Sequence, residues 1–360
     1  MVNYSRKELF LNMKKTLCAI LCAMLCLCTI TSALGETLVM SLIGDCTVGD
    51  QYCYRGYKSS YTYKIGQSGL DYPFSLAADL FKNDDLTVAN CEGVFTKRSP
   101  GKDAKFMTLG ADPSFAEVFK LGYVDVVNTA NNHGRDFGNK GREDTLKTFA
   151  DLDIGAFGDD TFYTTTVKGV KFGFFGYSYP FNDAKIKKYK KNIKTLRDEG
   201  CTFIVASCHW GKEDSLKINL EQKKYAEKII DLGADMVYGH GSHTVQPLEY
   251  YKGKMIFYSL SNFTFGANAA PKDDDTVVVQ VTFDVHEDGT MTATELRAIP
   301  YKMHMNKDFR PYPIEDEAGK QQVWKKLIFT RSSDPDSNMP ESFLTTGYAD
   351  LRLIDGEGKQ

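Results

Sequence analysis

Two histidines, His240 and His243, follow a short apolar run and are separated from each other only by glycine and serine. The run Met236–Tyr238 has the composition of a buried strand, and Gly239 allows the chain to turn sharply after it. Both imidazoles can therefore converge on one point above the strand end. Because neutral imidazole is the commonest side-chain metal ligand, this spacing indicates a metal site. A surface loop that happens to carry two histidines is the alternative.

The same pattern recurs along the chain. Other apolar runs lead into Gly44-Asp45, Asn90-Cys91-Glu92, Asn131-Asn132-His133 and Ser207-Cys208-His209. Asp, Glu, Asn and His are the ligand types of hard to borderline divalent cations. In α/β sheets, binding sites lie at the carboxyl ends of the strands. The chain has only six histidines, and chance is a poor explanation for the placing of four at such ends: His133, His209, His240 and His243.

The composition is that of an ordinary globular protein, and 360 residues suffice for one large domain or two small ones. The formal net charge is −3, which argues against nucleic acid as a partner. Five cysteines follow residue 35, and an odd number at irregular spacing is no disulfide framework. We interpret them as small buried packing residues, with a thiolate ligand as the alternative.

Residues 1–35 have the pattern of a secretory signal peptide whose true start is Met13. Two lysines precede the uncharged apolar run Leu17–Ile30, and small residues stand before Glu36 as in a cleavage site. The apolar run is short for a membrane span. We therefore expect a secreted or otherwise extracytoplasmic protein, with anchoring to the membrane by an uncleaved signal as the alternative.

Strand and helix patterns alternate through the first two-thirds of the chain, and the last part is mostly antiparallel. Helices are expected at Asp71–Asn83, Asp112–Leu121, Gly138–Leu152, Asp183–Glu199 and Ile218–Leu232, and hairpins within 162–178, 248–259 and 277–299. This order predicts one α/β domain at 36–330, with layered sheets covered by helices. Residues 331–360 are expected to be a polar, loosely attached tail.

Two segments of the sequence each allow two interpretations. Gln51–Gly69 is rich in tyrosine and is predicted to be a long loop near Asp45, whose rings either stack on a sugar or polymer or pack on one another. The helix expected at 183–199 carries six lysines, which either meet an anionic polymer or form a solvated face.

Six motifs occur in order between residues 38 and 300, and together they resemble the CapA-like proteins of poly-γ-glutamate capsule biosynthesis. They are Gly44-Asp45, Asn90-Cys91-Glu92-Gly93, Asn131-Asn132-His133 with Asp136 and Gly138, His209-Trp210-Gly211 with Glu213, Gly239-His240 with His243, Gln246-Pro247 and Glu249, and Tyr258-Ser259-Leu260-Ser261-Asn262-Phe263. That family looks like a divergent branch of the calcineurin-like metallophosphoesterases. The resemblance implies their four-layer α/β/β/α sandwich.

The resemblance also implies a site. The metal ligands would be Asp45, Glu92, Asn132, His209, His240 and His243. His133 would stabilise the leaving oxygen, and Asp136 of the same motif is predicted to be catalytic with it. The cofactor would be a divalent metal (Mn, Fe or Zn), as one or two ions. The chain departs from a phosphoesterase at Thr47, where a histidine is expected, so one half of a two-metal site loses ligands.

Two functions follow from this resemblance. The first is an extracytoplasmic role in capsule, poly-γ-glutamate or cell-wall polymer biosynthesis, beside a membrane polymer synthase and in contact with an anionic polymer or polysaccharide. The alternative is a secreted metal-dependent hydrolase of the phosphoesterase type, in which metal ions activate a water and His133 donates a proton to the leaving group. Fold-level resemblance alone does not fix the reaction.

Overall fold

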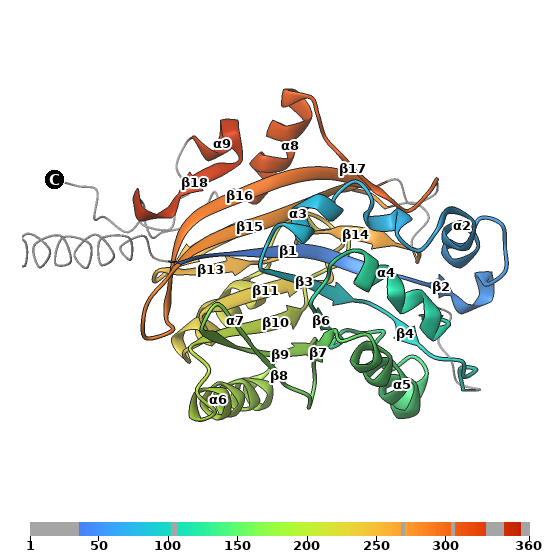
Figure 1. The fold of residues 1–360 in the computed structure, drawn as a ribbon, viewed down its shortest axis with the longest axis horizontal. Helices are drawn as coiled ribbons and strands as arrows, with labels where there is room; N and C mark the ends of the chain where they lie inside the picture. The colour runs from blue at the N-terminus through green and yellow to red at the C-terminus, as the bar shows by residue number, and fades with distance from the viewer. Residues whose placement is uncertain (1–35, 102–106, 268–270, 304–306, 329–341, 354–360) are drawn as a thin grey trace, which may run out of the picture. The chain divides into compact units, whose positions relative to one another are not determined.

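The computed structural model describes residues 36–101, 107–267, 271–303, 307–328 and 342–353 (Figure 1). The chain divides into two units, Met1–Thr37 and Leu38–Gln360. The predicted signal peptide at 1–35 lies outside the described residues. Among the helices that are described, none combines the length and the apolar character needed to cross a membrane.

The larger sheet has a parallel centre. Its adjacent parallel strands are β1 (Thr37–Thr47), β3 (Leu86–Cys91), β6 (Val126–Asn128) and β7 (Gly155–Phe157). On the other side of β1 the sheet continues with β15 (Asp275–Val285), β16 (Met291–Met303) and β17 (Pro311–Pro313). Two further strands each pair with one strand of this series: β14 (Asn262–Phe265) pairs with β1, and β18 (Tyr348–Asp350) pairs with β16. Because β1, β3, β6 and β14 are parallel, the first three end at the same edge of the sheet.

The second sheet is also parallel at its centre. Its order is β12 (Leu248–Tyr251), β13 (Lys254–Phe257), β11 (Met236–His240), β10 (Phe203–His209), β9 (Val170–Ser178) and β8 (Tyr163–Val167). Both outer strands are antiparallel members of hairpins. A small third sheet, built from β2 (Asp50–Gln51), β5 (Leu109–Ala111) and β4 (Val94–Phe95), extends from the ends of β1 and β3.

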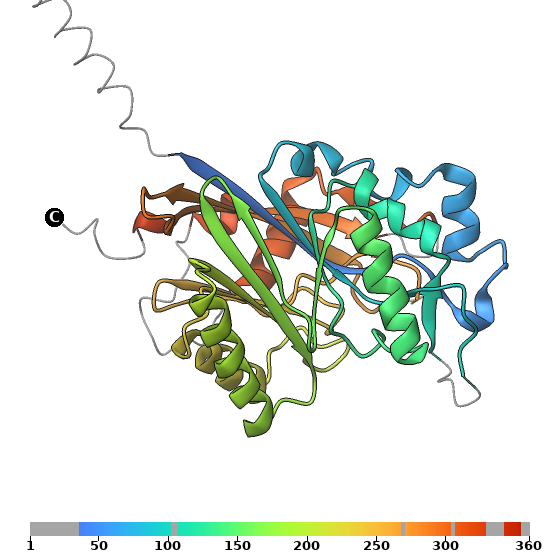
Figure 2. The same cartoon turned by 60° about the horizontal axis from the view of Figure 1, so that its bottom comes forward.

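The two large sheets pack face to face and are covered by helices on their outer faces (Figures 1 and 2). Between them lies a core to which the larger sheet contributes Leu42 and Val88 and the second sheet Phe174 and Val205. The outer face of the larger sheet packs on α2 (Tyr61–Ser68), α3 (Ala78–Lys82), α4 (Glu117–Leu121) and α5 (Gly138–Asp151), and that of the second sheet on α6 (Asp183–Asp198) and α7 (Leu220–Asp231). The predicted α/β/β/α order of layers is confirmed.

Two predicted elements differ from the structure. The helix expected over Asp71–Asn83 is reduced to α3, preceded by the 3-10 turn Tyr72–Phe74, because Ser75 Oγ donates a hydrogen bond to the carbonyl of Tyr72 and competes with the helical pattern. The loop expected over Gln51–Gly69 contains α2. Ser60 caps this helix by accepting from the Tyr63 amide.

The C-terminal segment also departs from the polar tail that we predicted. Between residues that are not described, α9 (Phe343–Thr346) and β18 pack on the sheet, and β18 pairs with β16. The side chains of Phe343, Ala349 and Leu351 are fully buried. These apolar residues are few and lie among polar ones, so no periodic pattern in the sequence indicates their burial. The helix α8 (Glu317–Leu327) packs nearby through Trp324.

A substitution at Gly44 can test how closely the backbone segments pack beside the strand ends. A Cβ at this position would lie 2.0 Å from the carbonyl oxygen of Ser261, which is backbone and has little room to move. We expect Gly44→Ala to lower the free energy of unfolding by at least about 1–3 kcal/mol, measured by urea denaturation. Gly66→Ala is the control, since nothing lies within 4 Å and alanine favours the helix by about 0.5–1 kcal/mol. Equal stability of the two variants would contradict this packing.

Candidate metal centre

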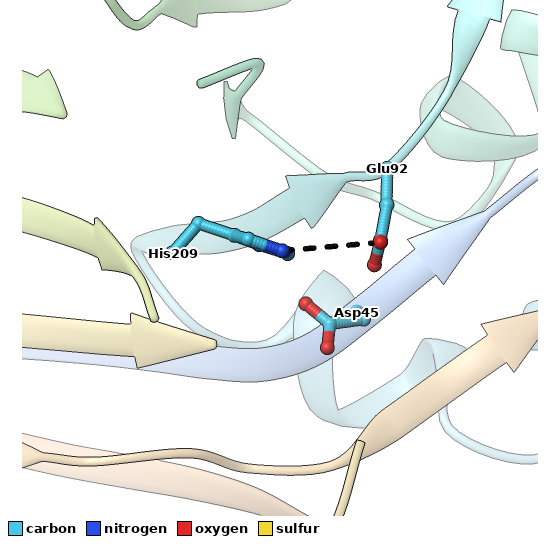
Figure 3. Close-up of side chains that lie close together, drawn as sticks. All are labelled: Asp45, Glu92 and His209. Atoms are coloured by element: carbon cyan, nitrogen blue, oxygen red, sulfur yellow. Dashed lines mark ion pairs between the residues drawn. The ribbon is translucent and has the colours of Figure 1, made fainter. Parts of the chain in front are cut away.

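Side chains from both sheets meet at the strand ends. Asp45 lies on β1 and Glu92 directly follows β3, whereas His209 ends β10 of the second sheet. Ligand atoms of these three residues lie within 4.8 Å of one another, and Figure 3 shows the side chains directed toward one another. All three residues are buried.

The carboxylate of Glu92 lies at the centre of the cluster. Its Oε1 is 3.9 Å from Nε2 of His209, 3.9 Å from Nε2 of His243 and 4.0 Å from Nε2 of His133. These separations are too long for hydrogen bonds, but those to His209 and His243 suit atoms that share an ion through bonds of about 2.0–2.2 Å. Within the described part of the chain, neither oxygen of Glu92 has a hydrogen-bond partner. A divalent cation would satisfy this buried carboxylate.

The histidines of the cluster differ in pKa. Burial lowers the pKa of His209 to about 3 and that of His240 to about 4, so both are neutral at pH 7, the form that ligates a metal. For His243, burial also lowers the pKa, but the charge of Glu92 and the hydrogen bond with Asp45 raise it to about 10.

The two carboxylates of the cluster, Asp45 and Glu92, also differ in pKa. Burial raises the pKa of Asp45, but the hydrogen bond and charge of His243 outweigh burial and hold the value at about 2. Burial dominates for Glu92, whose pKa rises to about 7. The surrounding residues thus stabilise the negative charge of Asp45 better than that of Glu92. Glu92 is therefore the carboxylate whose charge most needs a cation.

Asparagine side chains fix the positions of the acidic groups. Asp45 Oδ1 accepts from Asn90 Nδ2 at 2.7 Å, and Asn90 Oδ1 accepts from Asn128 Nδ2 at 2.8 Å. Asp45 Oδ2 accepts from the amide of Gly241 at 3.2 Å, which ties β1 to the loop after β11. Asn90 was part of a recognised motif, but its role as the support of Asp45 was not predicted.

The loop after β6 supplies the predicted catalytic pair. His133 Nδ1 lies 2.6 Å from Asp136 Oδ2, and the same oxygen accepts from the Leu109 amide at 2.8 Å. The neighbouring asparagines differ in burial. Asn132 is exposed, whereas Asn131 is buried and donates to the carbonyl of Cys91 at 2.8 Å. Asn131, rather than the predicted Asn132, therefore lies within the hydrogen-bond network of the site.

The remaining predicted ligand, His240, lies beside the centre. Its Nε2 is 2.6 Å from Ser207 Oγ and its ring meets Tyr238 edge-on, with ring centroids 4.2 Å apart. Its buried Nδ1 has no hydrogen-bond partner among the described residues, but the group of ligand atoms that lie within 4.8 Å of one another comprises Asp45, Glu92 and His209 without His240. Thr47, where the resemblance leads us to expect a histidine, instead donates through Oγ1 to the carbonyl of Glu92 at 2.8 Å.

The thiols near the centre are buried and protonated in the chain without metal. Cys46, Cys91 and Cys208 are buried. Burial raises the pKa of Cys208 to about 12, and that of the other two thiols also lies above the ordinary value. A protonated thiol is a poor metal ligand, which supports the interpretation of these cysteines as packing residues.

Comparison with known proteins agrees with the motifs and the geometry. Residues 39–267 match the model of the family described as "Bacterial capsule synthesis protein PGA_cap". The chain belongs to this family. The predicted relationship to CapA-like capsule biosynthesis proteins is therefore confirmed, and the aligned region contains all the predicted site residues.

Two relatives span most of the chain. The "Capsule biosynthesis protein CapA" of Bacillus anthracis is 28% identical over 319 residues, which cover 81% of this chain and 73% of the relative. The "PGA biosynthesis protein CapA" of Bacillus subtilis (strain 168) is 27% identical over 310 residues, covering 80% and 77%. Among solved structures, the purple acid phosphatase PPD1 of yellow lupin seeds is similar at 9% identity with a TM-score of 0.35, over 83% of this chain and 57% of that one. A likeness at that level establishes neither the fold nor an activity.

Glu92→Gln removes the central charge and keeps the shape of the side chain. We expect the affinity for Mn²⁺ or Zn²⁺, measured by chelator competition, to fall at least about tenfold, because the carboxylate is the better ligand. In protein stripped of metal, the pKa of His243 should fall from about 10, since the charge of Glu92 is a main cause of its elevation. Histidine NMR titration measures this shift.

Asp274→Asn is the matched control for Glu92→Gln. Asp274 belongs to the acidic run Asp273–Asp275 and pairs with Lys302 at 3.1 Å, so it already has a cationic partner. Its removal should leave the affinity for metal unchanged. Wild-type affinity in Glu92→Gln would contradict the assignment of Glu92 as a ligand.

Proposed function

We propose that this protein acts outside the cytoplasm in the biosynthesis of a capsular or cell-wall polymer, either poly-γ-glutamate or a polysaccharide, through a metallophosphatase-like centre. Membership of the capsule synthesis family supports the polymer role. The signal-peptide pattern of residues 13–35 supports the location. The expected partners are the anionic polymer or polysaccharide itself and a membrane polymer synthase.

One observation carries the metal-dependent part of this proposal: the buried carboxylate of Glu92 faces three Nε2 atoms at 3.9–4.0 Å and has no hydrogen-bond partner among the described residues. Asp45, Glu92, His209 and His243 would hold the ion, with Nδ1 of His240 as a further ligand. Mn, Fe or Zn fits this mixture of carboxylate and imidazole, as one ion or two. When bound, such an ion supplies hydroxide from water near neutral pH and polarises a phosphoryl or carbonyl oxygen.

The pair His133–Asp136 gives the centre a proton donor. Asp136 Oδ2 already accepts from the Leu109 amide, so this carboxylate is an acceptor and His133 Nδ1 donates to it. The opposite nitrogen, Nε2, is then the one that faces Glu92. From there a protonated His133 can donate to a leaving oxygen, with Asp136 stabilising the imidazolium.

A genetic test decides whether the centre is required. In a strain that lacks the gene, we expect the double variant Asp45→Ala, His243→Ala to restore less than about a tenth of the wild-type amount of surface polymer, because both residues would hold the ion and they contact each other. The control is Lys147→Ala, Asp151→Ala, which removes an exposed ion pair on α5. Immunoblots must show equal protein levels. Full restoration by the double variant would contradict a role for the centre.

The second candidate function is a secreted hydrolase of the phosphoesterase type, and the His133–Asp136 pair is the observation that favours it. Purified protein with Mn²⁺ would then hydrolyse bis-p-nitrophenyl phosphate. Turnover should fall about 10²–10⁴-fold in His133→Asn, as is typical when a general acid is removed. Protein that is loaded with metal and does not release nitrophenolate would exclude this activity on phosphodiesters.

A further inference from the structure

The motif Tyr258–Phe263 contains a buried asparagine beside the metal centre. Asn262 is the first residue of β14, and in the parallel pairing of β14 with β1 it lies opposite Asp45. The Asp45 amide donates to the carbonyl of Ser261 at 2.7 Å, and Asn262 is 1% exposed. The backbone therefore fixes the Asn262 side chain next to the carboxylate of Asp45.

Hydrogen bonding determines the orientation of both Asn262 and His243. His243 Nδ1 is 2.9 Å from Asn262 Oδ1 and 3.3 Å from Asp45 Oδ2. An ionised carboxylate can only accept, so Nδ1 carries a proton. The amide of Asn262 must then present its oxygen to this proton, which excludes the flipped orientation. The nitrogen left to ligate is Nε2, which lies 3.9 Å from Glu92 Oε1.

The backbone around this contact is held in an uncommon conformation. His243 and Ser261 both have positive φ angles, 57° and 67°, and Ser261 Oγ donates to the carbonyl of His243 at 3.2 Å. The ring of His243 packs on Phe265, also on β14, with centroids 5.1 Å apart. Non-glycine residues in the left-handed region cluster at functional sites, where surrounding contacts hold them in place. Here β14 provides those contacts.

A purely structural role explains Asn262 poorly. Its amide nitrogen Nδ2 is buried and has no hydrogen-bond partner within the described residues, and an unpaired buried donor costs stability. An apolar side chain of similar size would avoid that cost. The hydrogen bond that this side chain does make is directed to a predicted ligand.

We propose that Asn262 is a positioning residue of the metal centre: its carbonyl oxygen holds the Nδ1–H of His243, so that Nε2 is presented to the cation that His243 shares with Glu92. This inference rests on the metal centre of the proposed function. The contact is the outer hydrogen bond that a ligating histidine makes, and removal of such a partner weakens metal binding by about 10–100-fold.

The test compares three variants of the full chain by competition for Zn²⁺ with a chromophoric chelator. Asn262→Leu removes the acceptor and should lower the affinity about 10–100-fold. Asn262→Asp keeps an oxygen at the same place and should retain the affinity within a few-fold. The control Asn192→Leu removes a buried asparagine on α6 that donates to the Tyr177 hydroxyl at 2.7 Å, and it should bind zinc like the wild type.

Histidine NMR gives a readout that a general loss of stability would not move. With ¹⁵N-labelled histidine the chain has only six imidazole rings to assign. In the zinc-bound wild type and in Asn262→Asp, His243 should show a slowly exchanging proton on Nδ1. In Asn262→Leu and in the smaller Asn262→Ser, which decides the matter if the leucine variant does not fold, this proton should exchange rapidly.

The outcomes separate the two proposals. Wild-type zinc affinity in both Asn262→Leu and Asn262→Ser would overturn the positioning role and leave the metal centre standing. Equal losses in Asn262→Asp and Asn262→Leu would also overturn it, because the acceptor oxygen would then not matter. A wild-type protein that binds neither Zn²⁺ nor Mn²⁺ would overturn the metal centre, and the positioning role with it.

Discussion

The carboxylate of Glu92 is buried at the meeting point of the two sheets without a hydrogen-bond donor among the described residues, and this constraint governs the site. Burial of an unpaired charge costs several kcal/mol, so the Glu92 carboxylate either takes up a proton, for which burial raises its pKa to about 7, or is compensated by a nearby cation. Protonated His243 meets part of this need, and its high pKa is the consequence. A divalent ion meets it more fully, because the same carboxylate oxygen faces Nε2 of two proposed ligands, His209 and His243.

The fold brings these groups together by ending its parallel strands at one edge. The larger sheet contributes the carboxylates and the second sheet contributes His209 and the loop of His243, so the site exists only when the sheets pack. The hydrogen bond from Asn90 to Asp45 and the approach of Ser261 to Gly44 hold the acidic side in place. The preorganised groups can then act on a ligand with little rearrangement.

Sequence periodicity predicted layered sheets covered by helices and the strand-end cluster, because apolar runs that stop at polar ligands are visible locally. The α/β/β/α order of the layers was predicted from the family resemblance. Periodicity did not separate Asn131 from Asn132, since adjacent residues in a turn differ only in side-chain direction. The role of Asn262 depends on the pairing of β14 with β1, which joins residues more than two hundred positions apart and leaves no local signal. The buried segment around Phe343 was missed for the same reason, because its few apolar residues are covered by β16 and α8.

The most direct test of this account is a crystal structure grown with Mn²⁺, with anomalous scattering recorded at the manganese edge. The account predicts a peak within ligand distance, about 2.0–2.2 Å, of a Glu92 oxygen and of Nε2 of His243. The described residues contain a competing acidic cluster, Asp273–Asp275, whose carboxylates form ion pairs with Lys302 and Lys326. A manganese peak only at that cluster, or none near Glu92, would contradict the central claim.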